Sequence, residues 1–182
     1  MSRKKRVIGL SMAALLLLAL IALPVTGVVK VVKITSATMS PTVQAGDTIV
    51  VTKLFNPATA KKGDVVVYDG TSAGLKTLRE LYLTRVVATA GDTVDLVNGE
   101  LCVNGVPLPE RNGHRPRGSV ATIPGYAPPL YPVTVRTGSV FTVDDNHGTS
   151  LDGRYTGPIP VSSLVYSAKR ILKPGEHAGE IK

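Results

Sequence analysis

The 182-residue chain is poor in several residue types, with one Cys, two Phe and no Trp. Because Cys102 has no second cysteine to pair with, packing rather than an internal disulfide must stabilise the fold. The shortage of aromatic side chains argues against the stacking platforms with which proteins bind single-stranded nucleic acids. We therefore expect no nucleic-acid partner, and we also predict neither a metal ion nor a cofactor.

Negative charge is also in short supply, since 13 Asp and Glu stand against 21 Lys and Arg, a formal charge of +8. Four of the positive charges lie together in the cluster from Arg3 to Arg6. Such an excess suits a protein that lies near an anionic lipid surface, so membrane lipid is an expected partner.

A long apolar run follows the basic cluster and extends from Val7 to Leu23 with Ser11 as its main polar interruption. Its length predicts a transmembrane anchor over residues 7–27. Positive residues before it predict a cytoplasmic tail over residues 1–6, and an extracytoplasmic domain over residues 28–182. The protein would then be a single-pass protein of the cell membrane. A cleavable signal peptide is the alternative, although no Ala-x-Ala site precedes Pro24.

The outer domain repeats one local pattern, a Gly-Asp pair followed by a β-branched run. The pairs are Gly46-Asp47, Gly63-Asp64 and Gly91-Asp92. Glycine supplies the backbone freedom of a tight turn, and the runs fit a pleated, half-buried surface. The pattern predicts strands after each turn, over residues 48–51, 65–68 and 93–97. Further strands are expected over residues 29–34, 82–88, 133–136, 139–143 and 165–172.

Two Asn-Gly pairs, at Asn98 and Asn104, bracket residues 100–103 and predict a short hairpin unit. Residues 75–83 are compatible with a short turn of helix. Residues 107–132 are rich in Pro, Gly and Arg, and we interpret them as a long loop, either a lid or a plain surface excursion. The domain is therefore predicted to be mainly β.

Four segments in order resemble the conserved boxes of the type I signal peptidase family (signal peptidase I, peptidase family S26). They are Ile34 to Thr42, Gly63 to Tyr68, Tyr82 to Asp92 and Asp144 to Arg154. The resemblance implies the mainly β signal peptidase I fold with one N-terminal transmembrane helix. It also implies a serine-type endopeptidase scaffold that processes the signal peptides of exported preproteins.

The resemblance places two threonines at the catalytic positions. The family's nucleophilic Ser, directly before Met, is here Thr38, and its general-base Lys is here Thr84. A buried neutral Lys can accept the proton of the nucleophile, whereas a Thr hydroxyl cannot do so at physiological pH. The sequence therefore predicts a non-catalytic or weakly active homologue, a member of the preprotein-processing pathway that binds preproteins or tunes a signal peptidase paralogue.

Other site residues are also assigned by the resemblance. It implies an oxyanion-stabilising hydroxyl at Ser36 and, at Ser150, the hydroxyl that normally orients the Lys. A supporting polar cluster would comprise Arg85, Asp145, Asp152 and Arg154; a structural ion network is the simpler explanation for these four. Apolar substrate pockets would be lined by Met39, Val43, Tyr82 and Leu83, unless these residues belong to the core. His147, by contrast, is expected to be a solvated loop residue.

Two alternatives are also compatible with the sequence. The chain could be an active peptidase with a threonine nucleophile and an unidentified base. It could also be related to self-cleaving repressor proteases, which share the β core, although the anchor and the lack of a helix-turn-helix pattern argue against this.

Overall fold

The computed structural model describes residues 27–53, 56–75, 80–111, 113–118, 128–148, 150–172 and 179–181. Within these ranges, no helix combines the length and the apolar character needed to cross a bilayer. The predicted anchor over residues 7–27 lies outside the described residues, except for Gly27.

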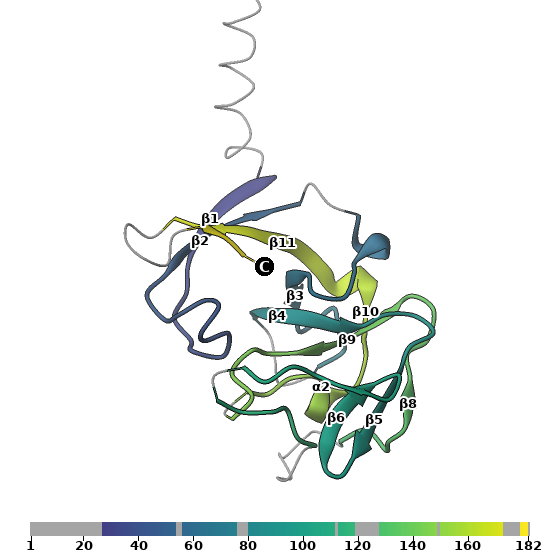
Figure 1. Cartoon of the computed structure of the whole chain (residues 1–182). Helices are drawn as coiled ribbons and strands as arrows, with labels where there is room; N and C mark the ends of the chain where they lie inside the picture. Colours follow the sequence, from purple (N-terminus) through teal and green to yellow (C-terminus); the bar gives the residue numbers. More distant parts are fainter. Residues whose placement is uncertain are drawn as a thin grey trace, which may run out of the picture.

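The described part of the chain is mainly β, as predicted, and its larger sheet has eight strands in the order β1-β2-β11-β3-β4-β9-β10, with β12 paired to β11. Each recorded pair is antiparallel. The sheet curves through the molecule in Figure 1. Its strands are β1 (Val29–Lys33), β2 (Thr48–Thr52), β3 (Val65–Asp69), β4 (Leu81–Ala88), β9 (Ser139–Val143), β10 (Ile159–Pro160), β11 (Leu164–Ile171) and β12 (Gly179–Glu180).

A smaller four-stranded sheet has the order β7-β6-β5-β8 and comprises β5 (Thr93–Val97), β6 (Glu100–Val103), β7 (Val106–Pro107) and β8 (Val133–Thr134). It lies at the end of the molecule opposite β1 (Figure 1). The predicted hairpin unit is confirmed, since Asn98-Gly99 and Asn104-Gly105 form its two turns with positive φ at all four residues. Asn and Gly tolerate this conformation better than other residues.

The three Gly-Asp pairs form turns of the same design. Gly46, Gly63 and Gly91 have φ angles of 93°, 95° and 89°. In each turn the Asp carboxylate accepts a hydrogen bond from the backbone N–H three residues earlier, at 2.8, 2.9 and 2.8 Å. The predicted turn chemistry is therefore present three times, and it fixes where β2, β3 and β5 begin.

Some sequence predictions were wrong in detail. A short turn of helix was compatible with residues 75–83, but its last part is strand. Strand β4 begins at Leu81 and pairs with β3 in a continuous antiparallel register, and residues 76–79 lie outside the described part. The strand expected over residues 133–136 is reduced to Val133–Thr134. The expected loop over residues 107–132 begins inside β7, and residues 119–127 lie outside the described part.

Short helical elements were not predicted. Helix α2 (Gly153–Thr156) has Asp152 as its N-cap, and 3-10 turns span Pro57–Thr59 and Val161–Ser163. Buried apolar residues form three clusters along the sheets, the first of which packs β2, β3 and β11 against Met39 and Val43.

Candidate active site

The first element of the site is the loop between β1 and β2, which carries Ser36 and Thr38. Backbone hydrogen bonds between Ile34 and the Gly46-Asp47 turn close the loop at 2.8 Å each. At its tip the Ser36 Oγ lies 3.2 Å from the Thr38 Oγ1, with either hydroxyl able to donate. Ser36 is exposed and Thr38 is half-buried, so this pair of hydroxyls is accessible from solvent.

Thr84 lies on β4, where only 1% of the residue is exposed. Its Oγ1 has no hydrogen bond of good geometry within the described structure. Arg85 pairs with Val143 across the β4–β9 ladder, so Thr84 stands opposite Asp144, the residue that follows β9. Directly opposed residues in an antiparallel pair bring their side chains close together.

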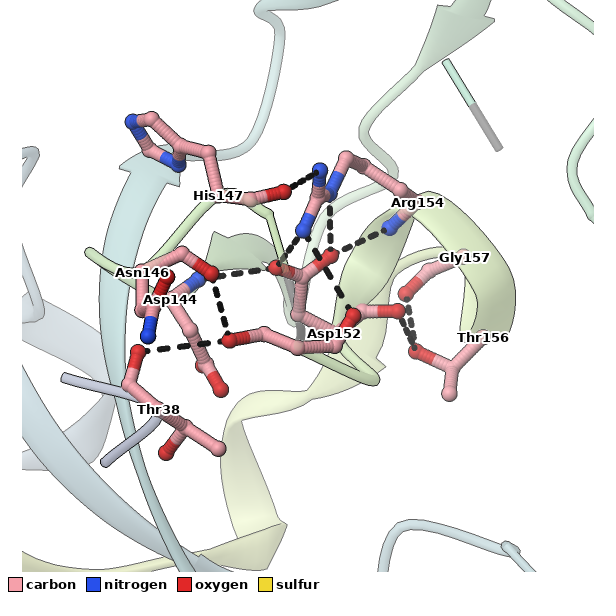
Figure 2. A network of polar contacts seen from close by, with 9 residues as sticks. Thr38, Asp144, Asn146, His147, Asp152, Arg154, Thr156 and Gly157 are labelled. Carbon is pink, nitrogen blue, oxygen red and sulfur yellow. Dashed lines mark hydrogen bonds and ion pairs between the residues drawn. The ribbon is translucent and has the colours of Figure 1, made fainter. Parts of the chain in front are cut away.

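The Asp144 side chain therefore occupies the space beside Thr84. Burial raises the pKa of Asp144 well above its ordinary value, and the negative charge of Asp152 adds to the rise. The Thr84 hydroxyl acts in the opposite direction and favours the carboxylate, although the contact is too poorly aligned to satisfy Thr84 fully. Figure 2 shows the Asp144 carboxyl group on the side of the network where the Thr38 side chain lies.

Arg85, the next residue on β4, forms a buried bidentate ion pair with Asp145. The Arg85 Nε and Nη2 donate to the two Asp145 carboxylate oxygens at 2.7 Å each, and Nη1 donates to the Gly63 carbonyl at 2.7 Å. Bidentate charge-assisted pairs are among the strongest hydrogen-bonded contacts in proteins. The pair expected from the sequence is thus present, and it joins β4 to the loop after β9.

That loop also holds the Thr38 loop in place. The Asn146 N–H donates to the Thr38 carbonyl at 2.8 Å, and the Asn146 Nδ2 donates to the Ala37 carbonyl at 3.0 Å. The Ser150 hydroxyl is directed at the carbonyls of Asn146 (2.8 Å) and Thr38 (3.3 Å). Ser150 therefore braces the backbone of Thr38, and no recorded hydrogen bond links it to Thr84.

Asp152 and Arg154 anchor the end of the loop from inside the protein. The Arg154 guanidinium donates to both Asp152 carboxylate oxygens at 2.8 and 2.9 Å, and to the His147 carbonyl at 2.8 Å (Figure 2). Burial alone would lower the pKa of Arg154, but its bonds to Asp152 raise it. The Asp144 N–H donates to the same carboxylate at 3.0 Å, so Asp152 connects both ends of the loop.

His147 was predicted to be solvated, and this prediction was wrong, since only 9% of the residue is exposed. The Arg154 guanidinium holds the His147 carbonyl, and the residue is enclosed by neighbours that include Leu108 and Pro109. Both ring nitrogens are buried without a hydrogen bond of good geometry. Burial lowers the pKa of His147, and the positive charge of Arg154 lowers it further, so the neutral imidazole is favoured.

The four residues assigned to substrate pockets divide into two pairs. Met39 and Val43 are fully buried in the core cluster of β2, β3 and β11. Tyr82 and Leu83 are half-buried on β4, where the Tyr82 ring stacks on Tyr68 at 5.5 Å between centroids. Leu83 lines a small apolar groove of about 90 Å³, which also contacts Ile34 at the base of the Thr38 loop.

Comparison with known proteins decides the family. The sequence model described as "Signal peptidase, peptidase S26" matches residues 5–172 of the chain. The chain belongs to this signal peptidase family. It is similar to signal peptidase I of Leptolyngbya laminosa, with 30% identity over 155 residues, covering 81% of this chain and 70% of that protein.

A plant relative is thylakoidal processing peptidase 1 of Arabidopsis thaliana, with 26% identity over 139 residues, 72% of this chain and 38% of that one. A signal peptidase I crystal structure from Enterococcus faecalis is 22% identical and covers 58% of this chain and 93% of that chain, at a TM-score of 0.40. The family membership therefore rests on the sequence matches.

Within this signal peptidase family member, sequence reasoning missed three neighbours of the predicted site. Asp144 was included only as the first residue of the fourth box, where the family resemblance places Gly. His147 was expected in solvent, and Arg111 was not singled out at all. Arg111 lies in the Pro-rich segment, and its Nε contacts Asp145 at 3.3 Å. Its partner is 34 positions away, and no local sequence pattern indicates such a contact.

Proposed function

We propose that this signal peptidase family member binds the signal-peptide region of exported preproteins and hydrolyses it slowly or not at all. The observation that carries the proposal is the buried Thr84 side chain at the general-base position, which offers a hydroxyl where the reaction needs an amine. The only side-chain partner recorded for the Thr38 Oγ1 within the described residues is another hydroxyl, that of Ser36.

A hydroxyl nucleophile needs a base that removes its proton as the new bond forms. Loss of one member of such an interdependent pair typically lowers the rate by about 10⁴-fold to 10⁶-fold, roughly 5 to 8 kcal/mol of barrier. The Thr38 methyl group also restricts rotation about χ1, which limits the approach of a peptide carbonyl. The two replacements therefore favour binding without turnover.

Peptide binding is supported by the edge of β4. The β9 strand pairs with β4 only over Arg85, Val86 and Ala88, so the start of β4 extends past the end of β9. Leu83, the last residue of that stretch before Thr84, lines the apolar groove with Ile34. An extended peptide could add to this edge as a further strand and place small apolar side chains in the groove.

The proposal includes a location. The basic cluster before an apolar run supports a single membrane anchor with an outward-facing domain, next to the path of exported preproteins. Binding without hydrolysis would let the protein retain or present preproteins to an active signal peptidase paralogue.

The test uses the full chain in lipid nanodiscs and a preprotein with a photo-crosslinking residue beside its cleavage site. We expect crosslinks to the Thr38 loop or β4, with no cleavage product. Leu83→Asp should reduce crosslinking about tenfold, since a charge is costly in an apolar groove. Val97→Asp, at an exposed apolar position on β5, is the matched control. Absence of crosslinks would overturn the proposed binding, and cleavage that Thr38→Ala abolishes would overturn the proposed inactivity.

A second candidate, an active endopeptidase, is favoured by one observation, the Asp144 carboxyl beside Thr84. A carboxylate whose pKa is raised by burial is a stronger base than an exposed one and can act as a general base. In that case wild-type protein would cleave the preprotein, and both Thr38→Ala and Asp144→Asn would abolish cleavage.

A further inference from the structure

A cavity of about 490 Å³ lies between the two sheets. Its walls come from β4 and β9 of the larger sheet, from β6 and β7 of the smaller one, and from residues 108–111 and 145–147. Neither Thr38 nor Thr84 lines it. Its volume is in the range of small-molecule sites, which are mostly apolar with a few convergent polar groups.

The walls of the cavity have that character. Apolar side chains line most of it, among them Val86, Val103, Leu108 and Val143. Three cationic side chains, Lys62, Arg85 and Arg111, also line it, whereas Asp145 is the single carboxylate among the lining residues. The cavity therefore combines an apolar body with an excess of positive charge.

Arg111 supplies the part of this charge that is best placed to meet a ligand, since Lys62 is paired with Asp92 at 3.1 Å. Asp145 is already bound by Arg85 through two hydrogen bonds of 2.7 Å, whereas Arg111 approaches it through one nitrogen at 3.3 Å. The Arg111 side chain is 30% exposed, so it is less constrained than Arg85, which is buried. An anion in the cavity could thus engage Arg111 without leaving the Asp145 carboxylate uncompensated.

His147 provides a second polar group. Its ring lines the cavity, and in Figure 2 the imidazole points away from the Asp152–Arg154 network. Both nitrogens lack a hydrogen bond of good geometry, although the carbonyls of Pro109 and Asp144 lie near enough to influence the ring. A neutral imidazole carries one donor and one acceptor, so a ligand carboxylate could accept its N–H.

We propose that this cavity binds a small amphiphilic carboxylate, with its alkyl chain against the valines and its carboxylate between Arg111 and His147. The smaller sheet lies at the end of the molecule opposite β1, where the chain enters the described domain (Figure 1). With a membrane anchor before β1, the cavity would face away from the bilayer, which favours a free carboxylate over a lipid headgroup.

The test measures binding of octanoate to the full chain in nanodiscs by saturation-transfer NMR, with octanol and octylammonium as neutral and cationic counterparts. Arg111→Gln and His147→Phe should each weaken octanoate binding about tenfold, as expected for loss of a hydrogen bond to a charged group. Arg136→Gln, which removes an exposed cation outside the cavity, is the matched control and should leave binding unchanged.

Octanoate partitions into the nanodisc lipid equally for all variants. Differences in the saturation-transfer signal between variants therefore reflect binding to the protein. The proposal is overturned if octanoate does not bind, if octylammonium binds as tightly, or if both cavity variants bind octanoate like the control. Because no preprotein is present, this outcome is independent of the proposed peptide binding.

Discussion

Thr84 on β4 stands directly opposite Asp144 across the end of the β4–β9 ladder, and the Asp144 carboxyl lies beside the Thr84 hydroxyl. The resemblance to signal peptidases places Lys at the first position and Gly at the second. The two replacements are therefore neighbours in space, although 60 positions separate them in the sequence. A lysine restored at position 84 would meet a carboxyl group rather than the small residue that the family provides.

The first prediction concerns restoration of catalysis. Thr38→Ser with Thr84→Lys should remain nearly inactive, because the Asp144 carboxylate would pair with the new ammonium group and keep it protonated. Adding Asp144→Gly removes this charge and should raise preprotein cleavage by at least about 10²-fold over the double variant, since a neutral amine can then act as the base. Cleavage is measured by gel assay with the full chain in nanodiscs.

A control for this experiment is Asp69→Gly combined with the same two changes, since Asp69 is a carboxylate at the far end of β3. It should give no increase. If the double variant alone cleaves as well as the triple variant, Asp144 does not suppress the base and its position beside residue 84 has no catalytic consequence.

Local patterns predicted most of the strands, because turn chemistry and β-branched runs act over a few residues. The Gly-Asp and Asn-Gly turns illustrate this, since their positive φ angles and Asp hydrogen bonds are set within four residues. The predicted strand over residues 133–136 was too long, and the helical turn thought compatible with residues 75–83 is replaced by strand from Leu81 onward. In both places the outcome depends on which strand lies alongside, information that a single segment does not contain.

The candidate site was predictable only as far as the family resemblance reached. It indicated the Arg85–Asp145 pair, which is present, and it indicated Thr38, whose carbonyl is held by Asn146 next to that pair. It did not indicate that Asp144 faces Thr84, that His147 is buried, or that Arg111 forms an ion pair with Asp145. Each of these contacts depends on the path of a loop, which tertiary packing determines.

The second prediction is a pH-dependent gain in stability from Asp144→Asn. Because burial raises the pKa of Asp144 in the folded protein, the native state retains a proton over a pH range in which the unfolded chain, with a pKa of about 3.9, has lost it. Stability is therefore lost as the pH rises through that range. Urea denaturation should show Asp144→Asn to be more stable than the parent at pH 7, and the difference in the free energy of unfolding should shrink toward pH 4. A difference that stays constant with pH would show that the ionisation of Asp144 is not its cause.

The third prediction concerns the buried Asp152–Arg154 pair, whose side chains are almost completely inaccessible. Arg154→Met leaves an uncompensated carboxylate and frees the His147 carbonyl, so it should lower the free energy of unfolding by about 3 to 5 kcal/mol. The comparison is Lys62→Met, which breaks an ion pair whose lysine side chain is 51% exposed and should cost at most about 1 kcal/mol. If urea denaturation gives equal losses in the free energy of unfolding for the two variants, burial of the Asp152–Arg154 pair does not determine its contribution to stability.

The fourth prediction concerns His147→Phe, which keeps a flat ring and removes two buried nitrogens that have no hydrogen bond of good geometry. A fully unsatisfied buried polar group costs about 1 to 3 kcal/mol, and the carbonyls of Pro109 and Asp144 satisfy the ring only in part, so the variant should be more stable than the parent by about 1 kcal/mol at pH 8. Since burial lowers the pKa of His147 in the folded protein, the parent loses stability as the pH falls below about 6.5, where the unfolded chain takes up the proton. The gain in stability from His147→Phe, measured by thermal and urea denaturation, should therefore increase toward pH 5. The control is His114→Phe, at an exposed position, which should be as stable as the parent at both pH values.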